Sequence, residues 1–201
     1  GIIAEFKRKS PRKGWIKPKE TEIELTAKAY NEHGAAAISV LTDTDFFGGS
    51  LDDLIQARII TTVPLLRKEF IIDEWQIAEA KAFGADAILL IASCLTPAEV
   101  KHLAGFANNL GLEVLLELHD EEELEHICDE TELIGINNRN LKTFEVDIER
   151  SLRMAEKIPA GKIKIAESGI SSVKNINLFR HHGFHGFLIG ENFMKAPDPA
   201  I

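Results

Sequence analysis

The sequence predicts a (β/α)8 barrel that forms a single domain over residues 1–201. Apolar runs of strand length recur along the chain. Two of them, AILLIA and VLLEL, are continuous rather than alternating, which is typical of parallel strands covered on both faces. Helical patterns separate the runs at a period of roughly 20 to 25 residues. With 45% hydrophobic residues the chain can bury a large core, and its strand-plus-helix units match a closed barrel.

The expected strands are eight apolar runs that lie between turn or helix signals. They cover residues 2–7, 36–41, 64–67, 87–92, 113–118, 133–137, 162–167 and 186–189. Parallel strands of a barrel all end at one face, where the connecting loops build a pocket. Functional side chains are therefore expected at or just beyond the last residues of these runs.

Three segments between the strands carry apolar residues at helical spacing, and each stripe is expected to face the core. The stripes are Ile23, Ala27 and Tyr30; Trp75, Ala78, Ala82 and Phe83; and Val100, Leu103, Ala104 and Ala107. Helices are expected to close at Gly34, Gly84, Gly111 and Gly183. Residues 96–99, TPAE, begin a helix with a capping threonine, a proline and a glutamate.

Two other repeat architectures fit the pattern less well. A leucine-rich solenoid lacks its signature here. An open doubly wound sheet stays an alternative, but the segment after the first strand reads KSPRKG and holds neither GxGxxG nor a Walker motif. Only PDPAI follows Ala196, so the last helix is expected to lack most of its length, and the first residues already belong to a strand.

Composition limits the partners and the compartment. The formal net charge of −9 disfavours nucleic acid and anionic membrane surfaces, so an anionic substrate must be held by a local basic site. No apolar run approaches the roughly 18 residues of a membrane span. Cys94 and Cys128 are far apart in sequence, which indicates reduced thiols in a cytoplasmic protein. We expect Cys94 to pack near a strand end and Cys128 to lie in an acidic helix, neither acting as a nucleophile.

Five of the expected strands carry charged or polar residues where they enter the loops. These are Glu5 and Lys7; Lys68; Glu117; Asn137 and Arg139; and Glu167 and Ser168. Each one alone fits a salt bridge that closes the top of the barrel. Together they place three carboxylates and several cations in one mouth, where neighbouring charges separate pKa values as acid–base catalysis requires. The cluster is therefore a candidate catalytic site.

Glycines after the last two strands indicate a phosphate site. Gly169 follows Ser168 after the seventh strand, and Gly190 and Glu191 follow the eighth. Both turns lead toward a helix, so backbone N–H groups can approach an anion there. Either glycine alone is a weak signal, but the pair recurs in phosphate-binding barrels.

The histidines do not indicate a metal site. His181, His182 and His185 come just before the eighth strand, so we expect them at the face opposite the mouth. His119 follows Glu117 and can line the site without a metal, because no metal-ligand spacing accompanies it.

Seven motifs give the chain a resemblance to a known family. They are IIAEFKRKSP, LLRKEFIID, GADAILLIAS, LLELHDEEEL, IGINNRNLKTFEVD, IAESGI and FLIGENFM, spread over residues 1 to about 196. In order and spacing they resemble the indole-3-glycerol phosphate synthases of tryptophan biosynthesis. The resemblance implies ring closure of 1-(2-carboxyphenylamino)-1-deoxyribulose 5-phosphate with loss of carbon dioxide and water, and no metal or organic cofactor.

The resemblance also implies a role for each matched residue. Lys68 is implied as the general acid at the ribulose oxygen, Glu117 as the acid/base partner of dehydration, Glu5 as a further essential carboxylate and Asn137 as a positioning group. Lys7 is implied to hold an anionic end of the substrate, either its phosphate or its carboxylate. The polar wall is then Arg139, Glu167 and Ser168; the phosphate site is Ser10, Gly169, Gly190 and the Glu191 backbone; and the apolar box is Phe47, Phe70, Leu89 and Leu188.

Two departures and two alternatives accompany this resemblance. Family members usually carry a helical segment before the first strand, which is absent here, and Glu191 stands where some relatives have a small hydroxyl residue. Phosphoribosylanthranilate isomerase is the nearest other enzyme, but it would want a cysteine base on the first strand. A catalytically inactive barrel used for binding is the alternative outside the enzymes.

A monomer or weak homo-oligomer is expected, and association with other tryptophan-pathway enzymes is left open.

Overall fold

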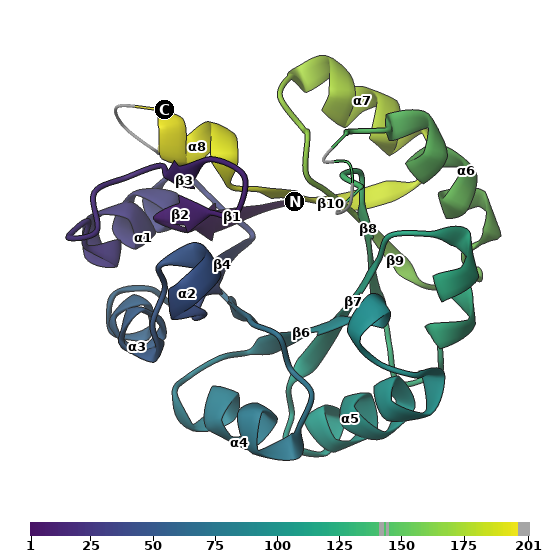
Figure 1. The fold of residues 1–201 in the computed structure, drawn as a ribbon, viewed down its shortest axis with the longest axis horizontal. Helices are drawn as coiled ribbons and strands as arrows, with labels where there is room; N and C mark the ends of the chain where they lie inside the picture. The colour runs from purple at the N-terminus through teal and green to yellow at the C-terminus, as the bar shows by residue number, and fades with distance from the viewer. Residues whose placement is uncertain (141–142, 144, 197–201) are drawn as a thin grey trace.

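In the computed structural model, which describes residues 1–140, 143 and 145–196, eight parallel strands close into a barrel (Figure 1). Around the barrel the strands follow the order β1, β10, β9, β8, β7, β6, β5, β4, so β1 pairs with both β10 and β4. Their bounds are β1 Ile2–Phe6, β4 Ala37–Leu41, β5 Leu65–Lys68, β6 Ala87–Ile91, β7 Glu113–Leu118, β8 Leu133–Asn137, β9 Ile163–Glu167 and β10 Phe184–Ile189. The predicted barrel is confirmed.

Continuous apolar strands are needed because each strand is buried on both faces. In β6, Leu89 and Ile91 belong to the small cluster inside the barrel, while Ile88 and Leu90 pack in the larger core between strands and helices. The inner cluster also contains Leu66, Leu115, Ile165 and Leu188. Side chains of alternate residues therefore separate into an inner and an outer core.

The helices form a ring outside the strands (Figure 1). They are α1 Ile23–Glu32, α2 Thr44–Phe47, α3 Leu51–Ile60, α4 Glu74–Ala82, α5 Pro97–Asn109, α6 Ile148–Lys157, α7 Val173–His181 and α8 Glu191–Lys195, with short 3-10 helices η1 Ala92–Cys94 and η2 Glu121–His126. A two-stranded hairpin, β2 Lys9–Ser10 and β3 Gly14–Trp15, follows β1. In the described residues, no helix is long and apolar enough to cross a membrane.

Several local predictions from the sequence are confirmed. The stripes of α1 and α5 are buried. The four glycines expected to close helices all have a positive φ, and the α5 capping box is complete, with Thr96 and Glu99 bonding each other's backbone. The last helix, α8, ends at Lys195, and residues 197–201 lie outside the described residues.

Other local predictions were wrong. Most of the stripe through Trp75 does not face the core: Trp75 is 82% exposed, Ala82 is exposed, and Ile77 and Ala80 are the buried residues of α4. Of the predicted stripe, Phe83 does pack against the core. Cys128 lies beyond η2 rather than in a helix, and Cys94 is exposed. In the connection between β7 and β8 the described helix is the short 3-10 segment η2.

The strand register brings the polar strand ends together. Because all eight barrel strands run parallel, Glu5, Lys68, Glu117, Asn137 and Glu167 lie toward the same face. In the ladder Leu41 pairs with Lys68, and Asn137 pairs with Glu167. The mouth predicted from the strand ends is therefore present.

Candidate active site

Lys68, the last residue of β5, lies at the centre of the mouth. Its Nζ is 2.8 Å from Glu167 Oε2, 3.5 Å from Glu117 Oε2 and 3.6 Å from Glu5 Oε2. These carboxyl groups come from β9, β7 and β1, so one ammonium connects strands across the barrel. Burial alone would lower the pKa of Lys68, but the three carboxylates outweigh it and hold that pKa well above its ordinary value. Lys68 is therefore charged at neutral pH.

Glu5 and Glu117 are held in their ionised forms. Burial alone would raise the pKa of Glu5, but Lys7 and Lys68 outweigh it and hold that pKa below its ordinary value. Burial likewise opposes ionisation of Glu117. Lys68, and hydrogen bonds from His119 and Asn137, outweigh it and hold the pKa of Glu117 well below its ordinary value. Two of the three carboxyl groups around Lys68 are thus ionised and able to accept a proton.

Glu167 behaves differently from the other two carboxyl groups. Its exposed fraction is only 1%, and its Oε1 is one of the buried oxygens that lack a hydrogen-bond partner among the described residues. Burial, together with the negative charge of Glu117, raises the pKa of Glu167 to about 7, although Lys68 opposes the shift. Of the three carboxyl groups around Lys68, Glu167 is therefore the one whose pKa lies nearest neutral pH.

Two glycines make room for the carboxyl groups. A Cβ at Gly135 on β8 would lie 2.1 Å from Glu167 Oε1, and a Cβ at Gly190 after β10 would lie 2.4 Å from Glu5 Oε1. Both distances are shorter than any van der Waals contact. The backbone positions beside these carboxyl groups can be occupied only by glycine unless the groups move.

Asn137 holds Glu117 in place from the neighbouring strand. Its Nδ2 donates to Glu117 Oε1 at 2.9 Å, and its Oδ1 accepts from the backbone N–H of Arg139 at 3.0 Å. Arg150 of α6 donates to the Asn137 carbonyl at 2.8 Å. The amide orientation is thus determined on both sides, which fits the predicted positioning role.

A cavity of about 660 Å³ opens above this cluster. Of the predicted site residues, all but Glu167 line it; Glu167 lies beneath Lys68 rather than in the polar wall. Phe47, Phe70, Leu89 and Leu188 provide apolar surface as predicted, and the rings of Phe47 and Phe70 are 6.3 Å apart. Charged and apolar walls in one cavity suit a ligand with an aromatic ring and anionic groups.

The loops after β9 and β10 form another wall of the cavity. Ser168 and Gly169 have φ values of 64° and 68°, and Ser168 is the one non-glycine residue with positive φ in the described part of the chain. Such a conformation is costly for serine and is typical of functional turns. Asn138 holds the turn by donating to the Ser168 carbonyl at 2.7 Å.

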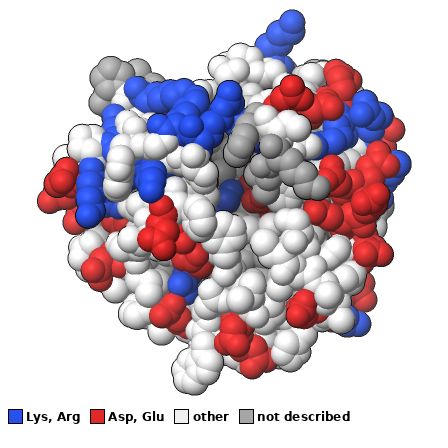
Figure 2. Space-filling model, viewed as in Figure 1, with Lys and Arg blue, Asp and Glu red and all other residues white. Residues whose placement is uncertain are grey.

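Glu191, the first residue of α8, lies among cations at this wall. Its carboxylate pairs with Lys13 and Lys195, and its Oε2 is 3.7 Å from Arg139 Nη2. Partial burial opposes ionisation, but hydrogen bonds from the two lysines lower the pKa of Glu191 to about 2. Figure 2 shows Lys and Arg side chains gathered over the β2–β3 hairpin and α8 on one side of the central hollow. Positive charge is thus concentrated at this wall of an otherwise acidic chain.

Arg8 anchors the segment that leads from β1 into the hairpin. Its guanidinium makes a two-point pair with Asp53 of α3, at 2.7 Å for each bond, and also donates to the carbonyls of Thr21 and Gly48. Because side chains alternate, Arg8 points away from the mouth while Lys7 reaches Glu5. Arg8 is thus a structural residue that fixes the backbone beside Lys7.

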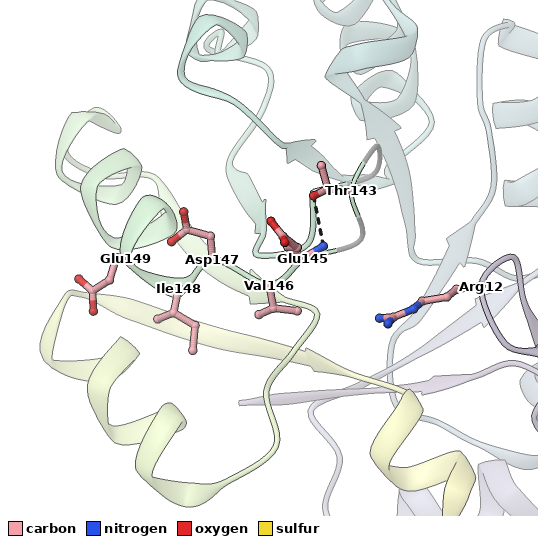
Figure 3. Close-up of a pocket in the computed structure, with 7 residues that line it drawn as sticks. All are labelled: Arg12, Thr143, Glu145, Val146, Asp147, Ile148 and Glu149. Atoms are coloured by element: carbon pink, nitrogen blue, oxygen red, sulfur yellow. Dashed lines mark hydrogen bonds between the residues drawn. The ribbon is translucent and has the colours of Figure 1, made fainter.

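A second, more open hollow of about 790 Å³ lies at the rim of the mouth (Figure 3). Arg12 lines both hollows, and residues 145–149 form the far side of this one. Val146 packs over the turn after β9, since a Cβ at Gly169 would lie 2.4 Å from Val146 Cγ1. The segment before α6 therefore covers the Gly169 turn from outside.

Sequence reasoning missed some residues of the cavity. Phe46 lines it beside Phe47, and Lys13 lines it beside Glu191. Lys13 could have been found as a further cation in the KSPRKG loop, and Phe46 as the neighbour of Phe47, because both phenylalanines belong to the short helix α2 beside the cavity. In the described residues, no group of three or more His, Cys, Asp or Glu side chains is placed to hold a metal ion.

Comparison with protein families and curated relatives gives one consistent result. The family model described as indole-3-glycerol phosphate synthase matches residues 1–201. An indole-3-glycerol phosphate synthase from Bacteroides thetaiotaomicron is 53% identical over 99% of this chain and 76% of that protein. One from Bordetella pertussis is 48% identical over 100% of this chain and 77% of that protein.

Solved structures show the same barrel at low sequence identity. A crystal structure of KGPDC from Streptococcus mutans has a TM-score of 0.69 at 15% identity, covering 99% of this chain and 91% of that one. A chain of the tryptophan synthase a2b2 complex from Pyrococcus furiosus has a TM-score of 0.69 at 17% identity, covering 96% and 88%. These similarities concern the fold alone.

Proposed function

We propose which side chains carry out the reaction in this chain, which belongs to the indole-3-glycerol phosphate synthase family and is a carboxy-lyase of tryptophan biosynthesis. The reaction closes a ring in 1-(2-carboxyphenylamino)-1-deoxyribulose 5-phosphate and releases carbon dioxide and water. It needs an acid at the ketose oxygen, a group that accepts a proton during dehydration, and sites for the phosphate and the aromatic ring.

Lys68 is the general acid of ring closure. The ring carbon that bears the carboxylate bonds to the ketose carbon, and the Lys68 ammonium gives its proton to the oxygen that becomes a hydroxyl. The positive charge of Lys68 faces the cavity, and its three carboxyl neighbours keep it protonated until substrate arrives. An ammonium placed where negative charge develops lowers the barrier of this step.

Decarboxylation follows without an oxidant. Ring closure leaves a cationic ring, and the electron pair of the bond to carbon dioxide restores its aromatic character. The apolar wall of Phe47, Phe70, Leu89 and Leu188 holds the ring while the charge disappears. A low-polarity wall favours this loss of charge.

Dehydration needs both a base and an acid. Glu117, ionised in the free protein, accepts the proton from the carbon next to the hydroxyl-bearing carbon. The Lys7 ammonium gives the departing hydroxyl the proton with which it leaves as water, and it also attracts the anionic part of the substrate. The Glu5 carboxylate, bonded to Lys7 at the cavity wall, holds that ammonium in place. Asn137 keeps Glu117 oriented, and Glu167 keeps Lys68 in position from below.

The phosphate lies against the turns after β9 and β10. Ser10, Ser168, Gly169, Gly190 and Glu191 line that wall, and Arg139 and Lys13 supply positive charge. For Glu191 we propose a contact through its backbone N–H, because its carboxylate pairs with lysines. No step of this proposal uses a cofactor.

The observation that carries the proposal is the convergence of three carboxyl groups on Lys68 beneath the cavity. Its test is to supply the carboxyphenylamino-deoxyribulose phosphate to the purified protein and record indole fluorescence. We expect product to form, and to be lost when Lys68 is replaced by methionine. Absence of product from the folded, full-length protein would contradict a catalytic function and favour a binding barrel.

Assembly and location are separate proposals. We propose a monomer or a weak homo-oligomer, in which each chain supplies from its own strands and loops all the residues given a role above. Light scattering at several concentrations tests this. Cys94 and Cys128 are both free thiols, which supports a cytoplasmic protein. Association with other tryptophan-pathway enzymes can be tested by co-purification from cells.

A further inference from the structure

His119 is a buried histidine behind the cavity wall. It follows β7 directly, its exposed fraction is 5%, and it is absent from the lining of the cavity. Its Nε2 lies 2.9 Å from Glu117 Oε1 and its Nδ1 lies 3.6 Å from Glu123 Oε2. Glu123, on η2, also accepts from the backbone N–H of His119. The imidazole is thus held between a carboxylate of the mouth and a second carboxylate further out.

The contacts determine which ring nitrogens carry protons. Nε2 lies 2.9 Å from Glu117 Oε1 and 3.5 Å from Asn137 Nδ2, which itself donates to Glu117. The shorter contact is with a carboxylate, which can only accept, so Nε2 is a donor. Nδ1 is buried and has no hydrogen-bond partner among the described residues, but the nearest charged atom facing it is Glu123 Oε2. A second proton on Nδ1 is favoured by that carboxylate, which gives an imidazolium between two negative groups.

The other charged and titratable groups around the ring leave the positive charge of the imidazolium favoured. Lys68 of β5 lies 3.5 Å from the other oxygen of Glu117, and Arg150 of α6 reaches the Asn137 carbonyl and Asp120. On η1, Cys94 has a pKa raised by burial and by the same two glutamates, so it stays a neutral thiol near neutral pH. Burial opposes charging of His119, but the hydrogen bond to Glu117 and the negative charges of Glu117 and Glu123 outweigh it and raise the pKa of His119 to about 10.

We propose that His119 is a positioning residue of the reaction: its imidazolium, held by Glu123, fixes the Glu117 carboxylate beside Lys68 and keeps it ionised until it accepts a proton. This inference rests on the proposed role of Glu117. The imidazolium keeps both of its protons throughout. It stabilises the charged form of Glu117 from the side away from the substrate, as a group behind a catalytic base does.

The substitution His119→Gln separates the charge from the hydrogen bond, because the glutamine amide can still donate near the Nε2 position. We expect kcat at pH 7.5 to fall about tenfold with KM changed less than about threefold. Loss of the charge raises the pKa of Glu117, so more of it is protonated at low pH. The ratio of kcat/KM of His119→Gln to that of the unaltered protein should therefore be at least about twofold lower at pH 5.5 than at pH 8.5. A ratio that does not change with pH overturns the inference.

His126→Gln is the matched control. His126 is a buried histidine at the end of η2, and its ring nitrogens face the carbonyls of Leu95 and Glu123 rather than a carboxylate. This variant tests loss of packing near η2 without loss of the charge beside Glu117. We expect its kcat/KM ratio to be independent of pH. A pH-dependent ratio equal to that of His119→Gln would overturn the inference, because η2 packing would then explain both.

A direct measurement does not depend on any variant being active. In ¹⁵N spectra of the histidine-labelled protein at pH 8, the His119 ring should show both nitrogens protonated. The chain has 7 histidines, and the His119 signal is identified as the one that is missing from the spectrum of His119→Gln. A neutral ring at pH 8 overturns the inference.

A further variant distinguishes failure of this inference from failure of the proposed function. Glu117→Gln keeps the shape of the side chain but cannot accept a proton. If it retains full activity, the proposed role of Glu117 is wrong and the role of His119 falls with it. If Glu117→Gln is inactive while His119→Gln behaves like the unaltered protein at every pH, only the inference about His119 is wrong.

Discussion

The inside of this barrel consists of two layers that differ in chemistry although they lie on the same strands. On β1, β5, β7 and β9 an inward apolar residue is followed two positions later by an inward charged one. The pairs are Ile3 and Glu5, Leu66 and Lys68, Leu115 and Glu117, and Ile165 and Glu167. The lower layer packs side chains against each other, while the upper layer surrounds one ammonium with carboxyl groups.

On each of these strands the layer that stabilises the fold and the layer that carries the charges are only about 7 Å apart, which is the rise of two strand residues. The lower layer gains free energy by removing apolar surface from water, and no individual contact there is specific. The upper layer takes charged groups out of water, which is favourable only when each of them has a partner. A change in one layer should therefore affect a different measurement from a change in the other.

The largest expected effect is that of Lys68→Met in the upper layer. Removing the ammonium takes away the proton donor and leaves Glu5, Glu117 and Glu167 without their shared partner. We expect kcat to fall by at least about 10³-fold, or about 4 kcal/mol, with the protein still folded and still binding product. Lys157→Met, at an exposed surface pair, is the control and should keep full activity. Turnover of Lys68→Met within a few-fold of the unaltered protein would exclude Lys68 as the acid.

Leu115→Ala, in the lower layer, should have the opposite signature. Leu115 is buried in the inner cluster, two residues before Glu117. The cavity left behind should lower the free energy of unfolding by about 2–5 kcal/mol, as measured by urea denaturation. We expect kcat to stay within about fivefold. If Leu115→Ala instead lost as much turnover as Lys68→Met while its free energy of unfolding stayed unchanged, stability and catalysis would not be divided between the two layers.

Glu167→Gln tests the one carboxyl group that resists ionisation. The folded-state pKa of Glu167 is raised to about 7 from 4.5, so its contribution to stability is complete below about pH 4.5 and is lost as the pH rises through 7. Glutamine has no such dependence. We therefore expect the free energy of unfolding of the unaltered protein, relative to Glu167→Gln, to fall by roughly 1–3 kcal/mol between pH 5 and pH 8. A difference that grows with pH would reverse the sign and contradict the assignment.

Glu191→Gln at the rim should have the smallest effect. Glu191 is partly exposed, so losing its pairs with Lys13 and Lys195 should change the free energy of unfolding by less than about 1 kcal/mol. The phosphate no longer competes with a carboxylate for Lys13, so KM should fall about two- to fivefold with kcat unchanged. Measuring KM at low and high salt checks the origin of this change, because a gain in affinity that comes from electrostatic attraction shrinks as the ionic strength rises. An increase in KM would show that Glu191 organises this wall instead.

Much of the fold could be predicted because burial on both faces leaves a direct trace in the sequence. Continuous runs such as AILLI gave strands within one or two residues of their bounds. The carboxyl ends of parallel strands must meet, so Glu5, Lys68, Glu117, Asn137 and Glu167 could be predicted to converge before any contact was known.

The remaining features depend on neighbours that are distant in sequence. The face of α4 that is buried is chosen by the strands beneath it, so Trp75 was placed on the wrong side from spacing alone. The position of Glu167 beneath Lys68, rather than in the cavity wall, depends on side-chain length and on the space beside Gly135. The raised pKa of Glu167 and the lowered pKa of Glu117 likewise depend on which oxygen each donor reaches.

Gly135 and Gly190 have a consequence for anyone who redesigns this barrel. Gly135 lies within β8 and Gly190 directly follows β10, and at such positions alanine or serine would normally improve packing and backbone rigidity. A procedure that rewards filled volume would therefore place a side chain at each, and would push Glu167 or Glu5 away from Lys68. The chemistry of the mouth depends on two side chains that the sequence leaves out, and these omissions do not appear among the contacts of the native state.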